Sequence, residues 1–334
     1  MRPPEINPSV PFLWEDGDRT VHYGRGALGR AAERLEPGYA LLSTPRARAV
    51  TPALVDRAGS VHDVAAGRVD EVAGDLRPQV SGDRLVALGG GRVIDVGKAL
   101  AAADPPRRIA AVPTTLSAAE MTSLHRQAAG VPGDTPHVRP TIVINDPALS
   151  ASQPEPVLAA SALNALSHAV EAPLTTRANP VATLAAHGGA WLLARAFDGP
   201  TPDRDALALG ALLAGYAADA AGYGLHHVMS QTLARVAGVG HASANAIMLP
   251  HTTRALARRA PAEMEQLATA AGEDLESAAG RLAARAGPLR LRERGVTAEM
   301  LGDCADAALR RAELGLTPPA ADRAELLAIY EAAW

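Results

Sequence analysis

The amino-acid sequence changes character near residue 150, and this change constrains the fold more than any other feature. Before it, short apolar runs alternate with stretches of helical length and predict β-strands at residues 39–44, 85–88, 109–112 and 142–144. This alternation is typical of a parallel sheet covered by helices. After the turn-like segment 145–147, Ala- and Leu-rich segments of helical length follow. They are broken at Pro154, Asn179-Pro180, Gly199-Pro200, Gly222, Gly238 and Pro261.

We therefore expect two domains, with a boundary near residue 150. Residues 1–150 are predicted to form an α/β domain of the nucleotide-binding type, and residues 151–334 an all-helical domain. The length of 334 residues agrees with this division, because one hydrophobic core seldom serves so long a chain. We expect a ligand in a cleft between the domains, since domain interfaces are usual ligand sites.

Composition excludes several classes of function. No apolar run approaches the roughly 18 residues of a membrane-spanning helix, and the first residues do not resemble a secretion signal, so we expect a cytoplasmic protein. A net charge of −4 without a basic stripe, and 3% aromatic residues, argue against nucleic-acid binding. The single cysteine, Cys304, excludes a disulfide framework and predicts buried packing. The expected partner is a small molecule.

A glycine-rich turn is the first candidate binding element. The strand at residues 85–88 leads into Gly89-Gly90-Gly91 and then into a helical stretch with Arg92, Asp95 and Lys98. Glycines let the backbone approach a pyrophosphate, and the free N–H groups at a helix start favour negative charge. Lys98 is the only lysine among 32 Lys plus Arg, and could reach a ligand or hold Asp95. The alternative is a bare strand-to-helix turn.

Hydroxyl side chains follow two other predicted strands. Thr114 and Thr115 come after the strand at 109–112, and Ser43 lies near the end of the strand at 39–44. Threonine hydroxyls and nearby N–H groups could bind ribose or phosphate oxygens, and Ser43 could contact the adenosine end of a nucleotide. A threonine that only caps the start of a helix is the alternative.

Histidines gather in the predicted helical domain. Six of the ten lie between positions 168 and 251. Asn164 and His168, four residues apart, would share one helix face, and a turn near Gly238 could bring His227 and His241 together. Three imidazoles and one amide oxygen could bind Zn²⁺ or Fe²⁺. Taken singly, each histidine is equally consistent with a hydrogen-bonded polar residue in a helix.

Together these segments resemble the iron-containing (group III) alcohol dehydrogenase family. The segments are GGGRVIDVGKAL, VPTTLSAAEMTS, NDPALS, ALNALSHAVEA and GLHHVMSQTLARVAGVGHASANAIMLPH, in matching order and spacing across residues 20–260. Within that family, the Glu-Met-Thr ending of the second segment, Asn164 and the His226-His227 pair resemble maleylacetate reductases.

The resemblance implies a dehydroquinate-synthase-like fold with NAD(H) or NADP(H) on the first domain and substrate on the second. By motif position, the residues implied in cofactor binding are Ser43, Gly90, Gly91, Arg92, Asp95, Lys98, Thr114 and Thr115. The implied metal positions are Asn164, His168, His227 and His241, and the implied catalytic residues are His168, His226, His227 and His241. Asn164 stands where the alcohol dehydrogenases have aspartate, which weakens or removes Fe²⁺ or Zn²⁺ binding. Without metal, the histidines would donate hydrogen bonds or protons to a carboxylate or enolate substrate.

Three departures from the family pattern affect the expected activity. Gln231 stands one turn after His227, where the family often has a histidine, and glutamine cannot relay a proton. Arg92 replaces a small hydroxylated residue, and either adds charge to the phosphate site or crowds it. Residues 124–140 do not match the usual hairpin or its cofactor-facing lysine.

The leading hypothesis is hydride transfer between NAD(P)H and a small oxo, enone or alcohol substrate, with His168, His227 and His241 around the reacting oxygen. The alternative is a member of the family that performs a non-redox cyclisation or elimination, or only binds a ligand. The resemblance also implies a homodimer. The sequence leaves open the substrate, the choice between NADH and NADPH, the presence of a metal and the direction of reaction.

Overall fold

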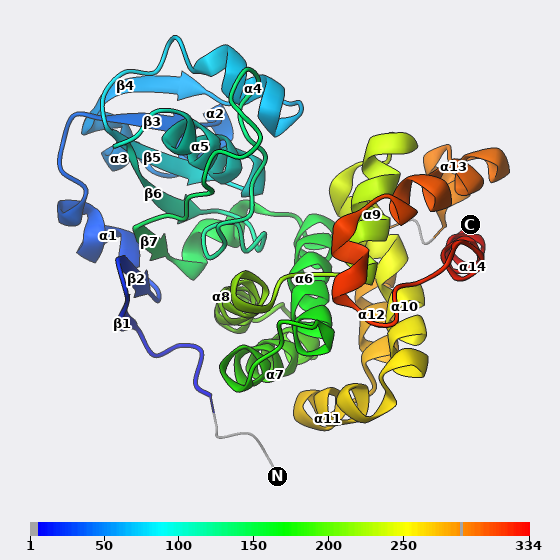
Figure 1. Cartoon of the computed structure of the whole chain (residues 1–334). Coiled ribbons are helices and arrows are strands. Elements are labelled where there is room, and N and C mark those ends of the chain that lie inside the picture. Colours follow the sequence, from blue (N-terminus) through cyan, green and yellow to red (C-terminus); the bar gives the residue numbers. More distant parts are fainter. Residues whose placement is uncertain (1–5, 288–289) are drawn as a thin grey trace. The chain divides into compact units, whose positions relative to one another are not determined.

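The computed structural model describes residues 6–287 and 290–334, and the chain divides into two compact units (Figure 1). One contains Asn7–Ser152 and the other Gln153–Trp334. The first is a sheet with helices, and the second is helical, as the fold class inferred from the sequence requires.

Seven strands of the described chain form one sheet in the order β1-β2-β7-β6-β5-β3-β4. They are β1 (Phe12–Asp16), β2 (Arg19–Tyr23), β3 (Tyr39–Ser43), β4 (Ala58–Asp63), β5 (Arg84–Gly89), β6 (Arg108–Pro113) and β7 (Ile142–Asn145). Only the β1–β2 hairpin is antiparallel. The four strands predicted from the sequence are confirmed. The other three were missed because they have no apolar run. β1 and β4 are half-exposed, alternating strands. β2, which pairs with β1, also alternates in burial along its length.

Helices cover the sheet because its central strands are apolar on both sides. The helices are α1 (Ala27–Ala31), α2 (Pro45–Ala49), α3 (Pro52–Asp56), α4 (Val69–Leu76) and α5 (Gly91–Ala103). Leu42, Leu85 and Ile109 pack in one cluster with α4 and α5, whereas their neighbours Leu41, Val86 and Ala110 pack in another with α1 and α3. This period of two is the alternation of side chains along a strand.

The second unit is built around α6, which packs against α7, α8, α10 and α12. Its helices are α6 (Glu155–Glu171), α7 (Pro180–Arg195), α8 (Arg204–Ala221), α9 (Leu225–Val236), α10 (His241–Arg259), α11 (Pro261–Ala271), α12 (Leu275–Ala286), α13 (Ala298–Leu309) and α14 (Arg323–Ala333). Every helix break predicted within 154–261 lies at a helix end or in the connection between two helices. Local chemistry explains these boundaries: Asn179 accepts a hydrogen bond from Ala182 N–H, Pro180 and Pro261 start helices, and Gly222 ends α8 at a φ of 77°.

Two further expectations concern the burial of Cys304 and the absence of a membrane-spanning helix. Cys304 is fully buried in α13, as predicted, and burial raises the pKa of its thiol to about 11. Among the described helices, none alone is long and apolar enough to span a bilayer. Together, α8 and α9 are long and apolar enough to span a bilayer, but the two helices are bent by 97° relative to each other.

The close contact of α7 with α8 depends on Gly210. A methyl group there would lie 2.8 Å from Leu193 Cγ and 3.2 Å from Leu192 Cβ, and the position of a Cβ atom is fixed by the α7 backbone. Gly280 of α12 is a matched position, because a methyl group there meets nothing within 4 Å.

We therefore expect Gly210→Ala to destabilise the protein relative to Gly280→Ala. Both variants gain helix propensity of about 1 kcal/mol, but only Gly210→Ala adds the cost of overpacking, about 1–3 kcal/mol. Urea unfolding followed by far-UV circular dichroism measures the difference. Equal midpoints for the two variants would show that α7 and α8 are not packed as described.

Residues 123–140 form neither helix nor strand, and His125 helps to hold them in place. Its Nε2 accepts a hydrogen bond from Val138 N–H at 3.2 Å, and its Nδ1 lies 2.9 Å from the carbonyl oxygen of Arg126, the arrangement of a neutral imidazole. Burial, with smaller contributions from nearby Lys98 and His137, lowers the pKa of His125 to about 4.

This depressed pKa predicts a loss of stability in mild acid. As the pH falls below the ordinary pKa of histidine, His125 becomes protonated in the unfolded chain. In the folded chain it stays neutral until about pH 4. The stability contributed by His125 is thus present above about pH 6.5 and is lost toward pH 4, by about 2 kcal/mol between pH 7.5 and 5. We expect His125→Gln to lose correspondingly less stability than the wild type over that interval in urea unfolding. Parallel pH dependences would contradict the assignment.

Candidate active site

The glycine turn lies where β5 ends and α5 begins. Gly89 is the last residue of β5, and Gly90 precedes the first residue of α5 without any side-chain cap. A Cβ on Gly90 would lie 3.0 Å from Thr115 Cγ2, and one on Gly91 2.9 Å from Ser117 Cβ. The turn thus packs against the segment that follows β6, because parallel strands end at the same edge of a sheet. The uncapped start of α5 is suited to an anion.

Arg92 and the threonines lie at this same edge. Arg92 is exposed on the first turn of α5, and Thr114 N–H donates to the carbonyl oxygen of Gly89 at 2.9 Å. Ser43 differs, because it is fully buried and its hydroxyl donates to the carbonyl oxygen of Leu88 at 2.8 Å. The Ser43 side chain therefore links two strands, and this geometry does not support the predicted contact with adenosine.

Lys98 faces the protein interior. Its ammonium donates to the carbonyl oxygens of Ala119, Thr122 and Leu124 at 2.8–3.0 Å, and it pairs with Asp95 Oδ1 at 2.7 Å. Of the two predicted roles, the structure shows the second, that of holding Asp95. Lysine suits this position because three donors on one slim stem can reach several carbonyl groups at once. Lys98 and Asp95 thus hold the chain after β6 in place, and the geometry does not support direct phosphate contact by either.

Glu120 was not selected from the sequence, yet it is almost completely buried in the same region. Burial raises the pKa of its carboxyl to about 7, while the charges of Lys98 and Arg19 act in the opposite direction. Its Oε2 has no hydrogen-bond partner within the described chain.

The candidate catalytic histidines come from three helices. Asn164 and His168 lie one turn apart on α6, His226 and His227 lie in the first turn of α9, and His241 begins α10. The His168 and His227 rings stack with centroids 4.2 Å apart, and the His226 ring lies edge-on to His227 at 5.2 Å. These four side chains are buried, whereas His241 is exposed. The spacing-based prediction of Asn164 and His168 on one helix face therefore agrees with the structure.

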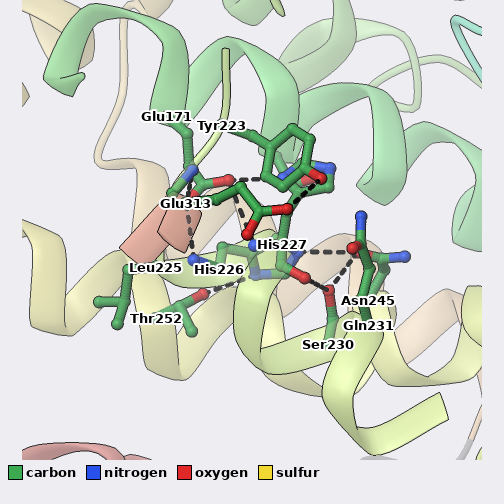
Figure 2. Close-up of polar contacts among 12 residues, drawn as sticks. Glu171, Tyr223, Leu225, His226, His227, Ser230, Gln231, Asn245, Thr252 and Glu313 are labelled. Atoms are coloured by element: carbon green, nitrogen blue, oxygen red, sulfur yellow. Dashed lines mark hydrogen bonds and ion pairs between the residues drawn. The ribbon is translucent and has the colours of Figure 1, made fainter. Parts of the chain in front are cut away.

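Glu171 binds both the ring of His227 and the start of α9 (Figure 2). Its Oε2 lies 2.5 Å from His227 Nδ1 and accepts from His227 N–H at 3.3 Å. Its Oε1 accepts from the backbone N–H groups of Gly224 at 3.2 Å and His226 at 2.6 Å. Sequence reasoning missed Glu171. Its place one turn after His168 was the only available signal, because its partners lie more than fifty residues away.

His226 is occupied on both ring nitrogens. Its Nδ1 lies 2.8 Å from Thr252 Oγ1 and its Nε2 2.9 Å from Asn245 Oδ1. Asn245 in turn donates through Nδ2 to the carbonyl oxygen of His241 at 3.0 Å and lies 3.1 Å from His241 Nε2. The geometry therefore gives His226 a positioning role that reaches His241 through Asn245, and does not support the predicted catalytic role.

Burial keeps the central imidazoles neutral. It lowers the pKa of His226 and of His227 to about 3, and it also lowers the pKa of His168 well below its ordinary value. Neighbouring imidazoles add to each shift, since two positive charges so close together repel. Burial also raises the pKa of Glu171, against the hydrogen bonds that favour its ionised form.

The predicted metal ligands do not converge on one point. The His168 and His227 rings stack with an interplanar angle of 23°, and His241 Nε2 lies 3.1 Å from Asn245 Nδ2. Within the described part of the chain, no three His, Cys, Asp or Glu side chains are placed to hold a metal ion. Asn164 contributes no charge, and the buried Nδ1 of His168 has no hydrogen-bond partner. As arranged, these four residues do not fit a resident metal.

A second polar group adjoins His227 and was not predicted. The Tyr223 ring lies 5.2 Å from the His227 ring, and its hydroxyl donates to Glu313 Oε1 at 3.3 Å. Arg311 pairs with Glu313 at 2.7 Å and donates to Gln231 Oε1 at 3.0 Å. Gln231 is therefore fixed in place by Arg311. No sequence pattern indicated this, because Arg311 and Gln231 are 80 residues apart.

Comparison with known proteins shows which proteins this chain resembles in sequence. The chain is 35% identical over 230 residues to maleylacetate reductase 1 from Cupriavidus pinatubonensis, covering 65% of each chain. It is 32% identical over 214 residues to 1,3-propanediol dehydrogenase from Citrobacter freundii, covering 58% of this chain and 55% of that one. The matches thus span between half and two thirds of these relatives.

Similarity to solved structures extends over the whole fold. The crystal structure of maleylacetate reductase from Agrobacterium tumefaciens superimposes with a TM-score of 0.82 at 28% identity, covering 97% of this chain and 98% of the other. The model of the Fe-containing alcohol dehydrogenase family, C-terminal, matches residues 158–334, which is more than half of the chain and includes His168, His226, His227 and His241. With the sheet, the glycine turn and these histidines in the same order as the motifs, the chain belongs to the iron-containing alcohol dehydrogenase family.

Proposed function

We propose that this protein is an NAD(P)H-dependent oxidoreductase that transfers hydride to or from a small oxo, enone or alcohol substrate, as a maleylacetate reductase or a propanediol dehydrogenase does. The observation that carries the proposal is the stacked pair of His168 and His227, two buried neutral imidazoles of which one is held by a carboxylate. Such a pair can orient a reacting oxygen without itself being charged.

The cofactor would bind at the glycine turn of the first unit. Backbone N–H groups at the start of α5 would hold its pyrophosphate, with Gly90 and Gly91 allowing close approach and Thr114 and Thr115 beside them. Arg92, exposed on the first turn of α5, would add positive charge. When bound, the nicotinamide supplies or accepts the hydride.

The substrate would be oriented in the second unit. His168 and His227 would contact its reacting oxygen, and His241 would complete this set from the start of α10. No step through a metal is proposed, because the four candidate ligands do not converge. The homodimeric state and the cytoplasmic location stay predictions.

Cofactor binding is tested by titrating the protein with NADH and with NADPH and following nucleotide fluorescence. We expect Gly91→Ala to weaken binding at least about tenfold, or 1.4 kcal/mol, because the added methyl group would displace the Ser117 segment from the turn. Gly280→Ala, in open space on α12, serves as the control and should bind as the wild type does. Equal affinities for all three proteins would remove the glycine turn from the cofactor site.

Turnover is tested by NAD(P)H oxidation with a panel of small carbonyl compounds and unsaturated oxo-acids. We expect His168→Gln to lower kcat by about 10²–10³, the usual effect of removing a group that orients the reacting oxygen, with cofactor affinity unchanged. His187→Gln is the control, since His187 lies on α7 and outside the site. The proposal fails if the wild type neither binds nicotinamide nor turns over any compound of the panel.

A further inference from the structure

We propose that Glu171 is a positioning residue that holds His227 as the tautomer protonated on Nδ1, so that Nε2 presents a lone pair to the ligand. In that state the ring of His227 can accept a hydrogen bond through Nε2 but cannot donate one. The tautomer follows from the structure alone. Its effect on turnover rests on the proposed function.

The contacts of Glu171 make it an acceptor only. Four N–H groups point at its two oxygens: Gly224 N and His226 N at Oε1, and His227 N and Nδ1 at Oε2. A proton on either oxygen would face one of these donors. Three of the four are backbone amides, which cannot become acceptors. An ionised carboxylate has no proton to donate, so with Glu171 ionised His227 Nδ1, at 2.5 Å, supplies the fourth proton.

Among the described residues, no group donates a hydrogen bond to the other ring nitrogen, Nε2. Ser167 Oγ lies 3.5 Å from His227 Nε2, but the Ser167 hydroxyl has a single proton and donates it to the carbonyl oxygen of Asn164 at 2.7 Å. A neutral imidazole protonated on Nδ1 carries its lone pair on Nε2. The lone pair of His227 is thus left for a ligand.

The neighbouring histidine, His226, is held in the opposite tautomer, protonated on Nε2. Asn245 Nδ2 faces His241, so Asn245 Oδ1 faces His226 and must accept from His226 Nε2–H. Ser230 Oγ also donates to this oxygen at 3.0 Å, which agrees with its orientation. Consecutive histidines of α9 are therefore held in opposite tautomers by different partners.

This tautomer determines which ligand groups His227 can bind. A substrate hydroxyl can donate to its Nε2, whereas a carbonyl or enolate oxygen cannot accept from it. The donor role for His227 considered from the sequence is therefore excluded while Glu171 is in place. A donor to a carbonyl oxygen has to come from another group of the site.

The experiment is a two-bond ¹H–¹⁵N correlation spectrum of the full chain labelled with ¹⁵N-histidine, at a pH above 7. The signals of His227 are assigned by their absence in His227→Gln. We expect Nδ1 of the wild type to show the shift of a protonated ring nitrogen and Nε2 that of an unprotonated one. The reverse pattern in the wild type would overturn the proposal.

Glu171→Gln should reverse the tautomer. Its oxygen must face the two backbone amides at the Oε1 position, because these cannot change. The side-chain NH₂ group then faces His227 Nδ1, which becomes an acceptor and moves the proton to Nε2. A folded Glu171→Gln variant, by circular dichroism, with the wild-type pattern would contradict the proposal.

Glu313→Gln is the matched control. It removes the same charge near His227, but Glu313 contacts Tyr223 and Arg311 and not the His227 ring. We expect the His227 tautomer to be unchanged in it, and a reversal there would show that charge, not contact, sets the proton. Glu171→Gln should also lower kcat about tenfold for oxidation of an alcohol substrate, because the hydroxyl of the alcohol loses its acceptor at Nε2. Absence of turnover in the wild type would count against the proposed function and leave the tautomer result valid.

Discussion

The hydrogen bonds to the Glu171 carboxylate join α6 to the start of α9, and the geometry of the histidines depends on them. Helix α9 begins at Leu225 without a side-chain cap from Gly224, and the backbone N–H groups of His226 and His227 would be buried and unpaired without Glu171. Burial of a carboxylate costs several kcal/mol unless it is compensated. Here four donors compensate it, and hydrogen bonds to charged groups contribute about 1.5–3 kcal/mol each.

In the first unit, a buried positive charge has the role that the Glu171 carboxylate has in the second. Lys98 is fully buried in α5, and its ammonium is surrounded by carbonyl oxygens of the chain after β6 and by Asp95. In each unit, one buried charged side chain on a helix binds a segment whose backbone groups have no partner in a regular helix or sheet. In the first unit that segment borders the glycine turn, and in the second it carries His226 and His227. Both proposed sites thus depend on a charge that does not itself contact the ligand.

Much of the fold was predictable because its signals are local. Pro180 and Pro261 start helices, Asn179 caps one and Gly222 ends one, and each acts within a few residues of its own position. The buried strands β3, β5, β6 and β7 were recognisable because strands covered on both sides have continuous apolar runs. The half-exposed strands β1 and β4 lack such runs, and their pairing with distant or hairpin partners determines them instead.

The candidate site was predictable as a set of residues but not as an arrangement of atoms. The sequence by itself determined that a glycine turn follows a strand, that Asn164 and His168 share a helix face, and that His227 and His241 flank a turn. Only the tertiary structure decided that Lys98 faces inward, that Ser43 links two strands, and that Glu171 holds His227. The physical reason is the range of the interactions. Helix spacing and capping act over about four residues, whereas the carbonyl partners of Lys98 and the carboxylate partner of His227 lie 21 to 56 residues away. The direction in which a buried donor or acceptor points is set by those distant partners, and no local pattern records it.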